Sequence, residues 1–356
     1  MVAVIWVGAE QADSGIITQG KVIALVNYMS QILVELIKMA NLIIIISKAV
    51  ACMNRVDSIF KVESSIEDKG RHGSRKPGSQ NSGSQNSGSQ NPGPQNSGPQ
   101  NPALRIPKVE FKDMEFVYAG AKEPALKDIS FCAMAGQTIG VIGGTGSGKS
   151  TLVNLIPRFY DAASGQVLVD GTDVKEYSLD ELRDKTGVVP QKSVLFKGTL
   201  RDNMRWGKQD ASDEEIYRAL DTAQAREFVD SKGEGLDLYI DQGGHNLSGG
   251  QRQRLTIARA LVRRPEILIM DDSASALDFA TDARLRKAIR ENTGDMTVFI
   301  VSQRATTIKS ADTILVLDEG RLAGMGTHKE LLKDCQVYRE ICLSQLSKEE
   351  VERDEQ

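Results

Sequence analysis

The sequence contains few aromatic residues, histidines and cysteines, and these shortages exclude several kinds of site. Aromatic residues make up 5% of the 356 residues, and there are 3 histidines and 4 cysteines. The histidines stand far apart and the cysteines form no C-x-x-C pair, so we expect neither a metal-ligand cluster nor a disulfide framework. The cysteines fit reduced cytosolic thiols. They are Cys52, Cys132, Cys335 and Cys342, and the histidines are His72, His245 and His328.

The chain also lacks an excess of positive charge. It has 44 Lys and Arg against 48 Asp and Glu, which gives a net charge of −4. A nucleic-acid-binding domain needs a basic face, so we expect no nucleic-acid partner. The length of 356 residues fits two domains.

Long apolar runs are few and lie near the N-terminus. Residues 1–9 are apolar but shorter than the roughly 20 residues that cross a bilayer, and no basic segment precedes them as in a signal peptide. We interpret them as the end of a membrane helix, followed by a polar turn from Glu10 to Gly20. The run from Val22 to Ala51 would be about 45 Å long as a helix, enough to cross a bilayer.

Two charges interrupt this second run. Glu35 and Lys38 are three residues apart, so on a helix they share a face and can pair. In lipid they would face other helices or an aqueous path. An amphipathic cytosolic helix is the alternative. Basic residues follow the run and acidic residues precede it, which predicts that the C-terminal end of this helix lies on the cytoplasmic side of the cell membrane. The basic residues are Lys48, Arg55, Lys61, Lys69 and Arg71.

Low-complexity sequence separates this region from the rest. Variants of Gly-Ser-Gln-Asn-Ser begin at positions 78, 83, 88, 93 and 98. Such sequence has almost no apolar residues to form a core, so we predict a disordered linker over 61–106. From 107 to 346, strand-like and helical patterns alternate and predict an α/β domain. We expect the charged tail, 347–356, to be frayed.

A glycine-rich loop follows the strand-like run Thr138–Ile142 and precedes a helical run. It fits G-x-x-x-x-G-K-S, in which glycines let backbone N–H groups turn onto phosphate oxygens. Lys149 would reach the β- and γ-phosphates, and Ser150 would ligate Mg²⁺. We therefore predict a nucleotide site formed by Gly143, Gly144, Thr145, Gly146, Ser147, Gly148, Lys149, Ser150 and Thr151.

A second motif, together with the glycine-rich loop, indicates a family resemblance. Residues 247–251 read Leu-Ser-Gly-Gly-Gln before a helical run, and the apolar strand Ile267–Asp271 follows. In this order the motifs resemble the ABC (ATP-binding cassette) superfamily. The segments 195–203 and 15–60 resemble its exporter branch. By resemblance, the signature motif consists of Leu247, Ser248, Gly249, Gly250 and Gln251. The resemblance also identifies Asp271 as the Walker B residue and Asp278 (in 275–278) as the D-loop residue. It identifies Gln191 as the Q-loop residue and Tyr118 as the residue that stacks on adenine.

The resemblance implies a P-loop NTPase fold, ATP as ligand, and Mg²⁺ held by Ser150, Gln191 and Asp271. It also implies that two cassettes pair head to tail, so that each signature motif closes on the partner's γ-phosphate. The partner would be a second half-transporter, and the missing membrane helices would come from elsewhere. The resemblance begins within the family's fifth membrane helix, so we expect a C-terminal piece of a half-transporter in the lipid bilayer.

Three positions depart from the family pattern. Asp272 stands where the family has the catalytic Glu, Gln303 where it has the switch His, and Gln242 near the place of a Glu before the signature. Asp is about 1.5 Å shorter than Glu, and a misplacement near 1 Å costs on the order of 10² in rate. We expect Asp272, Gln303 and Gln191 to form a weakly hydrolytic site in a heterodimeric exporter, which we favour over a homodimer.

Three alternatives remain. The chain would be a nucleotide-binding regulatory partner without hydrolysis, a non-functional truncated fragment, or an ATPase of the DNA-repair type. The last class places long coiled coils between the two motifs, whereas only about a hundred residues separate Lys149 from Ser248 here, so we disfavour it.

Overall fold

The computed structural model describes residues 2–61, 66, 106–273 and 277–355. The predicted linker over 61–106 therefore lies almost entirely outside the described residues. The chain divides into two compact units, Met1–Glu67 and Asp68–Gln356. Each unit is described by itself.

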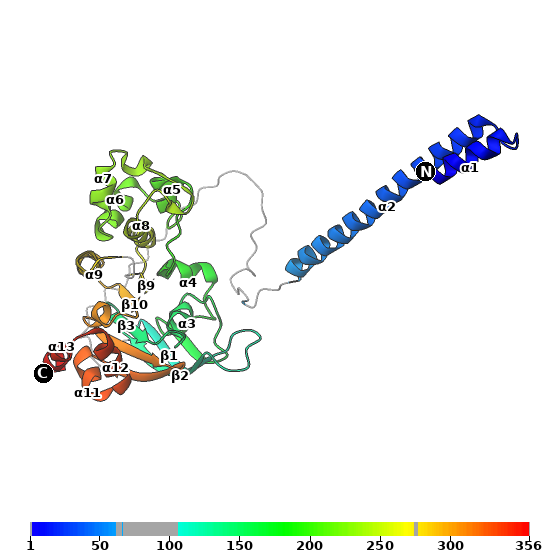
Figure 1. Ribbon diagram of the computed structural model, residues 1–356. Helices are drawn as coiled ribbons and strands as arrows, with labels where there is room; N and C mark the ends of the chain where they lie inside the picture. Colours follow the sequence, from blue (N-terminus) through cyan, green and yellow to red (C-terminus); the bar gives the residue numbers. More distant parts are fainter. Residues whose placement is uncertain (1, 62–65, 67–105, 274–276, 356) are drawn as a thin grey trace, which may run out of the picture. The chain divides into compact units, whose positions relative to one another are not determined.

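The N-terminal unit is a helical hairpin of α1 (Val2–Asp13) and α2 (Gln19–Phe60) (Figure 1). Helix α1 runs through the start of the predicted polar turn, because Glu10 to Asp13 continue its last turn. Gly8 is the buried residue of α1, and a Cβ there would lie 2.7 Å from Val22 Cγ1. Close helix packing therefore requires a small residue at this position.

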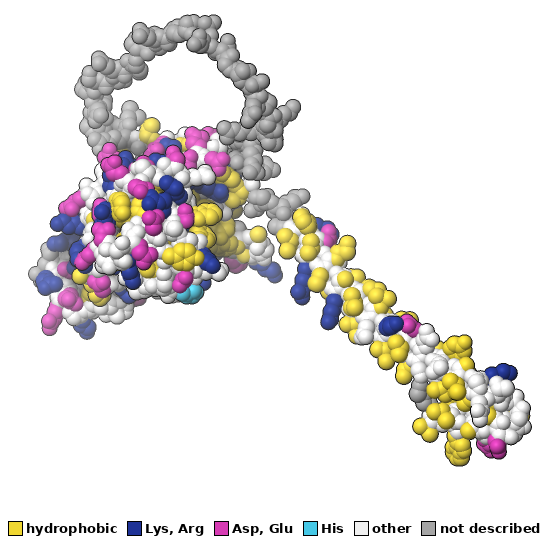
Figure 2. All heavy atoms as spheres, turned by 90° about the horizontal axis from the view of Figure 1, so that it is seen from above, with side chains coloured by type: hydrophobic (Ala, Val, Ile, Leu, Met, Phe, Trp, Pro, Cys, Tyr) yellow, Lys and Arg dark blue, Asp and Glu magenta, His cyan; other side chains and the backbone are white. Residues whose placement is uncertain are grey.

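Helix α2 has 42 residues, more than the predicted run from Val22 to Ala51. It is the one helix in the described part of the chain that is long and apolar enough to cross a membrane. Hydrophobic side chains cover it along its length (Figure 2). Lys38 Nζ lies 2.8 Å from Glu35 Oε1, so the predicted pairing of these two charges is confirmed.

The second unit is built on two large sheets. A mixed six-stranded sheet has the order β12-β11-β3-β10-β9-β6, and a four-stranded antiparallel sheet has the order β2-β1-β4-β5. A small third sheet pairs β7 with β8. The strands are β1 (Val109–Phe116), β2 (Leu126–Ala133), β3 (Thr138–Gly143), β4 (Ser164–Val169), β5 (Thr172–Asp173), β6 (Thr186–Val189), β7 (Gly198–Thr199), β8 (Tyr239–Ile240), β9 (Ile267–Asp271), β10 (Thr297–Val301), β11 (Thr313–Asp318) and β12 (Arg321–Gly326).

Helices cover the central sheet and form a separate lobe of α5 to α8 (Figure 1). They are α3 (Lys149–Asn154), α4 (Leu179–Lys185), α5 (Leu200–Arg205), α6 (Asp213–Thr222), α7 (Arg226–Ser231), η2 (Gly235–Asp237), η3 (Gln242–Gly244), α8 (Gly249–Leu261), α9 (Phe279–Asn292), α10 (Ala305–Ile308), α11 (His328–Asp334), α12 (Gln336–Gln345) and α13 (Lys348–Glu355). The α/β fold predicted from the alternating patterns is confirmed.

Two apolar cores hold these layers together. One lies between the two sheets and includes Phe111, Ile139 and Phe299, all at most 1% exposed. The other joins the opposite face of the central sheet to the helical lobe and includes Ile142, Leu255 and Met270. Strands β3, β9 and β10 are buried on both faces, which explains their nearly continuous apolar sequences.

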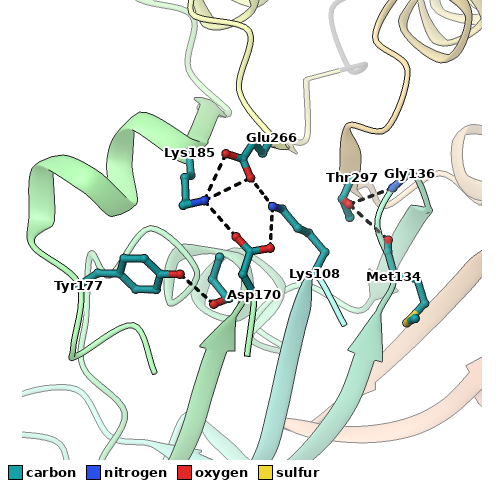
Figure 3. Close-up of polar contacts among 9 residues, drawn as sticks. Lys108, Met134, Gly136, Asp170, Tyr177, Lys185, Glu266 and Thr297 are labelled. Atoms are coloured by element: carbon teal, nitrogen blue, oxygen red, sulfur yellow. Dashed lines mark hydrogen bonds and ion pairs between the residues drawn. The ribbon is translucent and has the colours of Figure 1, made fainter. Parts of the chain in front are cut away.

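Four charges tie the antiparallel sheet to the central one (Figure 3). Lys108 precedes β1, Asp170 follows β4, Lys185 ends α4, and Glu266 precedes β9. Lys108 Nζ lies 2.7 Å from Asp170 Oδ1, and Lys185 Nζ lies 3.0 Å from Asp170 Oδ2 and 3.2 Å from Glu266 Oε1. Lys108 also pairs with Glu266. This four-charge cluster holds the starts of β6 and β9 against the antiparallel sheet.

One helical pattern is interrupted, and one local prediction was wrong. The helical period of the sequence from Asp213 to Asp230 forms two helices, because Gln224 has a φ of 55° and interrupts the chain between α6 and α7. The tail predicted to be frayed forms α13. Val351 is 1% exposed and Asp354 pairs with Lys309, so burial and an ion pair offset the cost of ordering this charged segment.

Candidate functional site

Four neighbouring parallel strands end at one edge of the central sheet. They are β3, β10, β9 and β6, which pair in that order and all in parallel. The carboxyl ends of parallel strands meet at the same edge, where α/β proteins bind ligands. Each strand is followed by a predicted site segment: the glycine loop after β3, Gln303 after β10, Asp271 and Asp272 at the end of β9, and Gln191 after β6.

The glycine loop follows β3 directly, and its glycines are required by their surroundings. A Cβ on Gly143 would lie 2.1 Å from the Leu317 carbonyl oxygen and 2.6 Å from Ser147 Oγ. Gly148 has a φ of 95°, and a Cβ there would lie 2.6 Å from Leu126 Cδ2. No side chain fits at either position without displacing backbone or core atoms, so the loop keeps a shape that other residues cannot adopt.

Lys149 lies folded over this loop. Its Nζ donates hydrogen bonds to the carbonyl oxygens of Gly143 (3.0 Å) and Gly144 (2.6 Å). The ammonium is therefore held against the glycine loop, where a phosphate group bound by the loop would meet a positive charge. Burial lowers the pKa of Lys149, while the negative charges of Asp272 and Asp271 oppose that shift.

Ser150 and Asp271 meet across the loop. Ser150 Oγ donates a hydrogen bond to Asp271 Oδ1 at 2.9 Å. Burial raises the pKa of Asp271, as does the neighbouring Asp272 carboxylate, while the Ser150 hydroxyl and Lys149 lower it. A hydroxyl, one carboxylate and phosphate oxygens are a ligand set that suits Mg²⁺. In the described part of the chain, no group of three or more His, Cys, Asp or Glu side chains could hold a metal ion.

Asp272 adjoins Asp271 but contacts a different segment. Gln191 Nε2 donates a hydrogen bond to Asp272 Oδ2 at 3.2 Å. Asp272 has a φ of 46°, so the chain turns sharply out of β9 at this residue. Its N–H donates to the Val301 carbonyl oxygen at 2.9 Å, which ties the turn to the end of β10. Gln303 follows on that side and is exposed.

Tyr118 approaches from the antiparallel sheet. Its hydroxyl is 2.7 Å from Thr151 Oγ1, and its ring meets Phe116 and Tyr160 edge to face. It is 39% exposed, so part of the ring is free to contact a ligand. These residues enclose one cavity of about 410 Å³. Its lining is Tyr118, Ala125, Thr145, Gly146, Gly148, Lys149, Ser150, Thr151, Gln191, Asp271, Asp272, Val301, Ser302 and Gln303.

The cavity brings together most of the predicted site residues. Gly143, Gly144 and Ser147 shape the loop behind it without lining it. Ala125 and Val301 line it without having been predicted, because neither carries a chemical group that a sequence motif would single out. Ser302 is 1% exposed and its hydroxyl accepts a hydrogen bond from the Arg304 N–H, which fixes the backbone around Gln303.

The predicted signature motif lies apart from this cavity. Among the described residues that line the cavity, none comes from 247–251. Ser248 is exposed and caps α8: its Oγ accepts from the Gln251 N–H, and Gln251 Oε1 accepts from the Ser248 N–H. The motif therefore begins a 13-residue helix whose exposed N-terminus offers N–H groups to an anion.

The two remaining predicted positions have local roles in the fold. Asp278 caps α9 by accepting a hydrogen bond from the Thr281 N–H at 2.9 Å. Two residues of the predicted D-loop, Ser275 and Ala276, lie outside the described residues. Gln242 begins η3 and is exposed.

Comparisons with known proteins agree with the motifs. The family model described as "ABC transporter" matches residues 126–275. An uncharacterized ABC transporter ATP-binding protein of Mycobacterium tuberculosis is 39% identical over 347 residues, covering 97% of this chain and 55% of that protein. An ATP-dependent lipid A-core flippase of Haemophilus influenzae is 43% identical over 240 residues, covering 67% of this chain and 41% of that protein.

A solved structure is also similar. It is described as a bacterial Atm1-family ABC exporter with ATP bound, and it matches with a TM-score of 0.65 and 38% identity. The match covers 70% of this chain and 44% of that one. The chain spans about half the length of the curated relatives that match nearly all of it.

Proposed function

The chain belongs to the ABC transporter family, and we propose that it binds MgATP as the nucleotide-binding part of an exporter that works as a dimer. The observation that carries the proposal is the contact between Ser150 Oγ and Asp271 Oδ1 beside the Lys149 ammonium, in a cavity at the ends of four parallel strands. Lys149 would bind the β- and γ-phosphates, and Tyr118 would lie against the adenine. Bound Mg²⁺, held by Ser150, Asp271 and Gln191, would neutralise phosphate charge.

Titration of the purified full chain with the fluorescent analogue mant-ATP tests this binding. We expect saturable binding that Lys149→Ala weakens by about a hundredfold, because a charge-assisted contact to phosphate is lost. Lys232→Ala is the matched control, since Lys232 lies at the end of α7 in the helical lobe. Equal affinities for the chain and its Lys149→Ala variant would refute the proposal.

The signature motif would act on a second cassette. Ser248 and Gly249 are exposed and contribute nothing to the lining of the chain's own cavity. Their exposed helix N-terminus suits a phosphate group supplied by a partner. This arrangement supports head-to-tail pairing with another half-transporter. In such an exporter, α2 would be one of the membrane helices, and the cassette would lie in the cytoplasm at the cell membrane.

The chain's own site would hydrolyse ATP slowly. The Asp272 side chain is one methylene shorter than a Glu side chain, and its carboxylate accepts a hydrogen bond from Gln191. Gln303 offers an amide, which can donate to a phosphate but carries no titratable proton. With the loop and signature intact, this combination supports a heterodimer in which the faster hydrolysis occurs at the partner's nucleotide, completed by Ser248 of this chain.

Mutations in a mixed complex with a partner cassette test the division of labour. Ser248→Ala should lower the ATPase rate strongly, and Asp272→Ala should change it little. The opposite result, in which Asp272→Ala abolishes turnover and Ser248→Ala leaves it unchanged, would contradict the heterodimer. Binding of mant-ATP without any ATPase activity in any pairing would instead favour a regulatory partner.

A further inference from the structure

The C-terminal helices reach back to the segment that carries Gln303. Gln345, the last residue of α12, makes two hydrogen bonds with that segment. Its Nε2 donates to the Gln303 carbonyl oxygen at 2.8 Å, and its Oε1 accepts from the Ala305 N–H at 2.9 Å. One amide side chain thus bridges the two peptide groups on either side of Arg304. The donor and acceptor partners also fix which way round the amide lies.

The far end of the same segment is held as well. Lys309, which follows α10, places its Nζ 2.6 Å from Asp354 Oδ2 in α13. Helix α13 is anchored by Val351, which is 1% exposed. The stretch from Gln303 to Lys309 is therefore fixed at both ends by residues that lie about forty positions further along the chain.

We propose that Gln345 is a positioning residue that aims the Gln303 side chain into the nucleotide cavity. The proposal rests on the proposed function, in which the Gln303 amide faces the γ-phosphate. Gln303 is exposed and lines the cavity, and its side chain has several rotatable bonds. Fixing its backbone reduces the conformational freedom that is lost when the amide meets a phosphate. The effect should then depend on whether the nucleotide has a γ-phosphate.

The test compares mant-ATP with mant-ADP on the full chain in the presence of Mg²⁺. We expect Gln345→Ala to weaken mant-ATP binding about fivefold, the effect of one modest hydrogen bond, and to leave mant-ADP binding unchanged. Gln345→Glu should behave like Gln345→Ala, because it keeps the acceptor for Ala305 but sets a carboxylate oxygen against the Gln303 carbonyl oxygen. The matched control is Gln336→Ala on the same helix, whose amide donates a hydrogen bond to Glu340 Oε1 within that helix.

A double variant decides whether Gln345 acts through Gln303. In a Gln303→Ala background, adding Gln345→Ala should cause no further loss of mant-ATP affinity. Independent, additive losses would overturn the inference, and so would an equal loss of mant-ATP and mant-ADP affinity with a lower melting temperature, which would indicate a purely structural role.

The outcomes for the two proposals are separable. If Lys149→Ala leaves mant-ATP binding intact, the proposed function itself fails. If Lys149→Ala abolishes binding and Gln303→Ala lowers the preference for mant-ATP, but Gln345→Ala does not, only the inference about Gln345 fails.

Discussion

Gln191 Nε2 donates a hydrogen bond to Asp272 Oδ2 at 3.2 Å, across the gap between the ends of β6 and β9. The amide and the carboxylate follow directly after two neighbouring parallel strands, so the pairing of these strands limits the separation of the two side chains. A carboxylate that accepts this hydrogen bond is held toward Gln191. Under the proposed function, a water activated by Asp272 would lie near both side chains, and the short Asp272 side chain would limit the rate of hydrolysis.

Lengthening the side chain at position 272 by one methylene should accelerate ATP hydrolysis. We expect Asp272→Glu to raise the ATPase rate of the purified chain on the order of tenfold, because the carboxylate moves about 1.5 Å further into the cavity. Steady-state phosphate release measures the rate, and mant-ATP titration checks that affinity is unchanged. Asp318→Glu, at the exposed end of β11, is the control. An unchanged or lower rate in Asp272→Glu would contradict the proposal that the short Asp272 side chain limits hydrolysis.

The Mg²⁺ dependence of nucleotide binding should reside in Asp271. The unmodified chain should bind mant-ATP about tenfold more tightly with Mg²⁺ than with excess chelator, and Asp271→Asn should remove most of that difference. The reason is the loss of the anionic oxygen beside Ser150. Asp318→Asn again serves as the control. If Asp271→Asn kept the full Mg²⁺ effect, another group would have to hold the ion.

The four-charge cluster should make stability depend on acid pH. The hydrogen bond from Lys108 lowers the pKa of Glu266. Burial alone would raise the pKa of Asp170, but hydrogen bonds from Lys108 and Lys185 outweigh it and leave that pKa lowered. Carboxyl groups with lowered pKa values stabilise the fold above the pKa values of the unfolded chain, near pH 4, and this contribution is lost as the pH falls further.

Thermal melting of Glu266→Gln checks this expectation. At pH 7 the variant should melt about 2 °C below the unmodified chain, a small effect because Glu266 is half exposed. The difference should shrink as the pH falls below about 4. Glu291→Gln, which removes one partner of an exposed pair on α9, should show no such trend. A difference that is constant from pH 7 to pH 3 would mean that charge is not the cause.

The folded tail should depend on its one buried side chain. Val351→Asp sets a charge at a site that is 1% exposed, so α13 should detach. Hydrogen exchange of the α13 amides should then speed up by at least about tenfold, while exchange in β9 and β10 stays slow. Glu352→Ala on the exposed face of the same helix is the control. Unchanged protection in Val351→Asp would show that α13 is held by its ion pairs alone.

The sequence predicted the parts of the site that depend on local chemistry. The glycine loop, the strand ending in Asp271 and the helix after Ser248 each have a pattern whose cause is local: glycine conformations, an apolar run, a helix cap. The same holds for the pairing of Glu35 with Lys38, because helix periodicity alone sets their spacing.

Features that depend on distant residues were not predictable in this way. The break at Gln224 falls inside a helical period, and no glycine or proline marks it. The tail looks solvated because a single valine carries its burial. The amide of Gln345 has no motif, since its partners are peptide groups about forty residues away in the sequence. Each of these required the fold before its partner could be identified.

The backbone pairing of the parallel strands fixes the frame of the site independently of the side chains that follow the strands. Asp271 pairs with Val301, and Val301 pairs with Val141, so backbone hydrogen bonds fix where each strand delivers its last residue. Exchanging a side chain just beyond that edge leaves the ladder unchanged. Under the proposed function, a substitution at 272 would alter how fast the nucleotide is consumed and would leave the glycine loop that holds it unchanged. The proposed slow hydrolysis would then set how long the nucleotide stays bound, and one side chain beyond the sheet edge would change that time without a change in the fold.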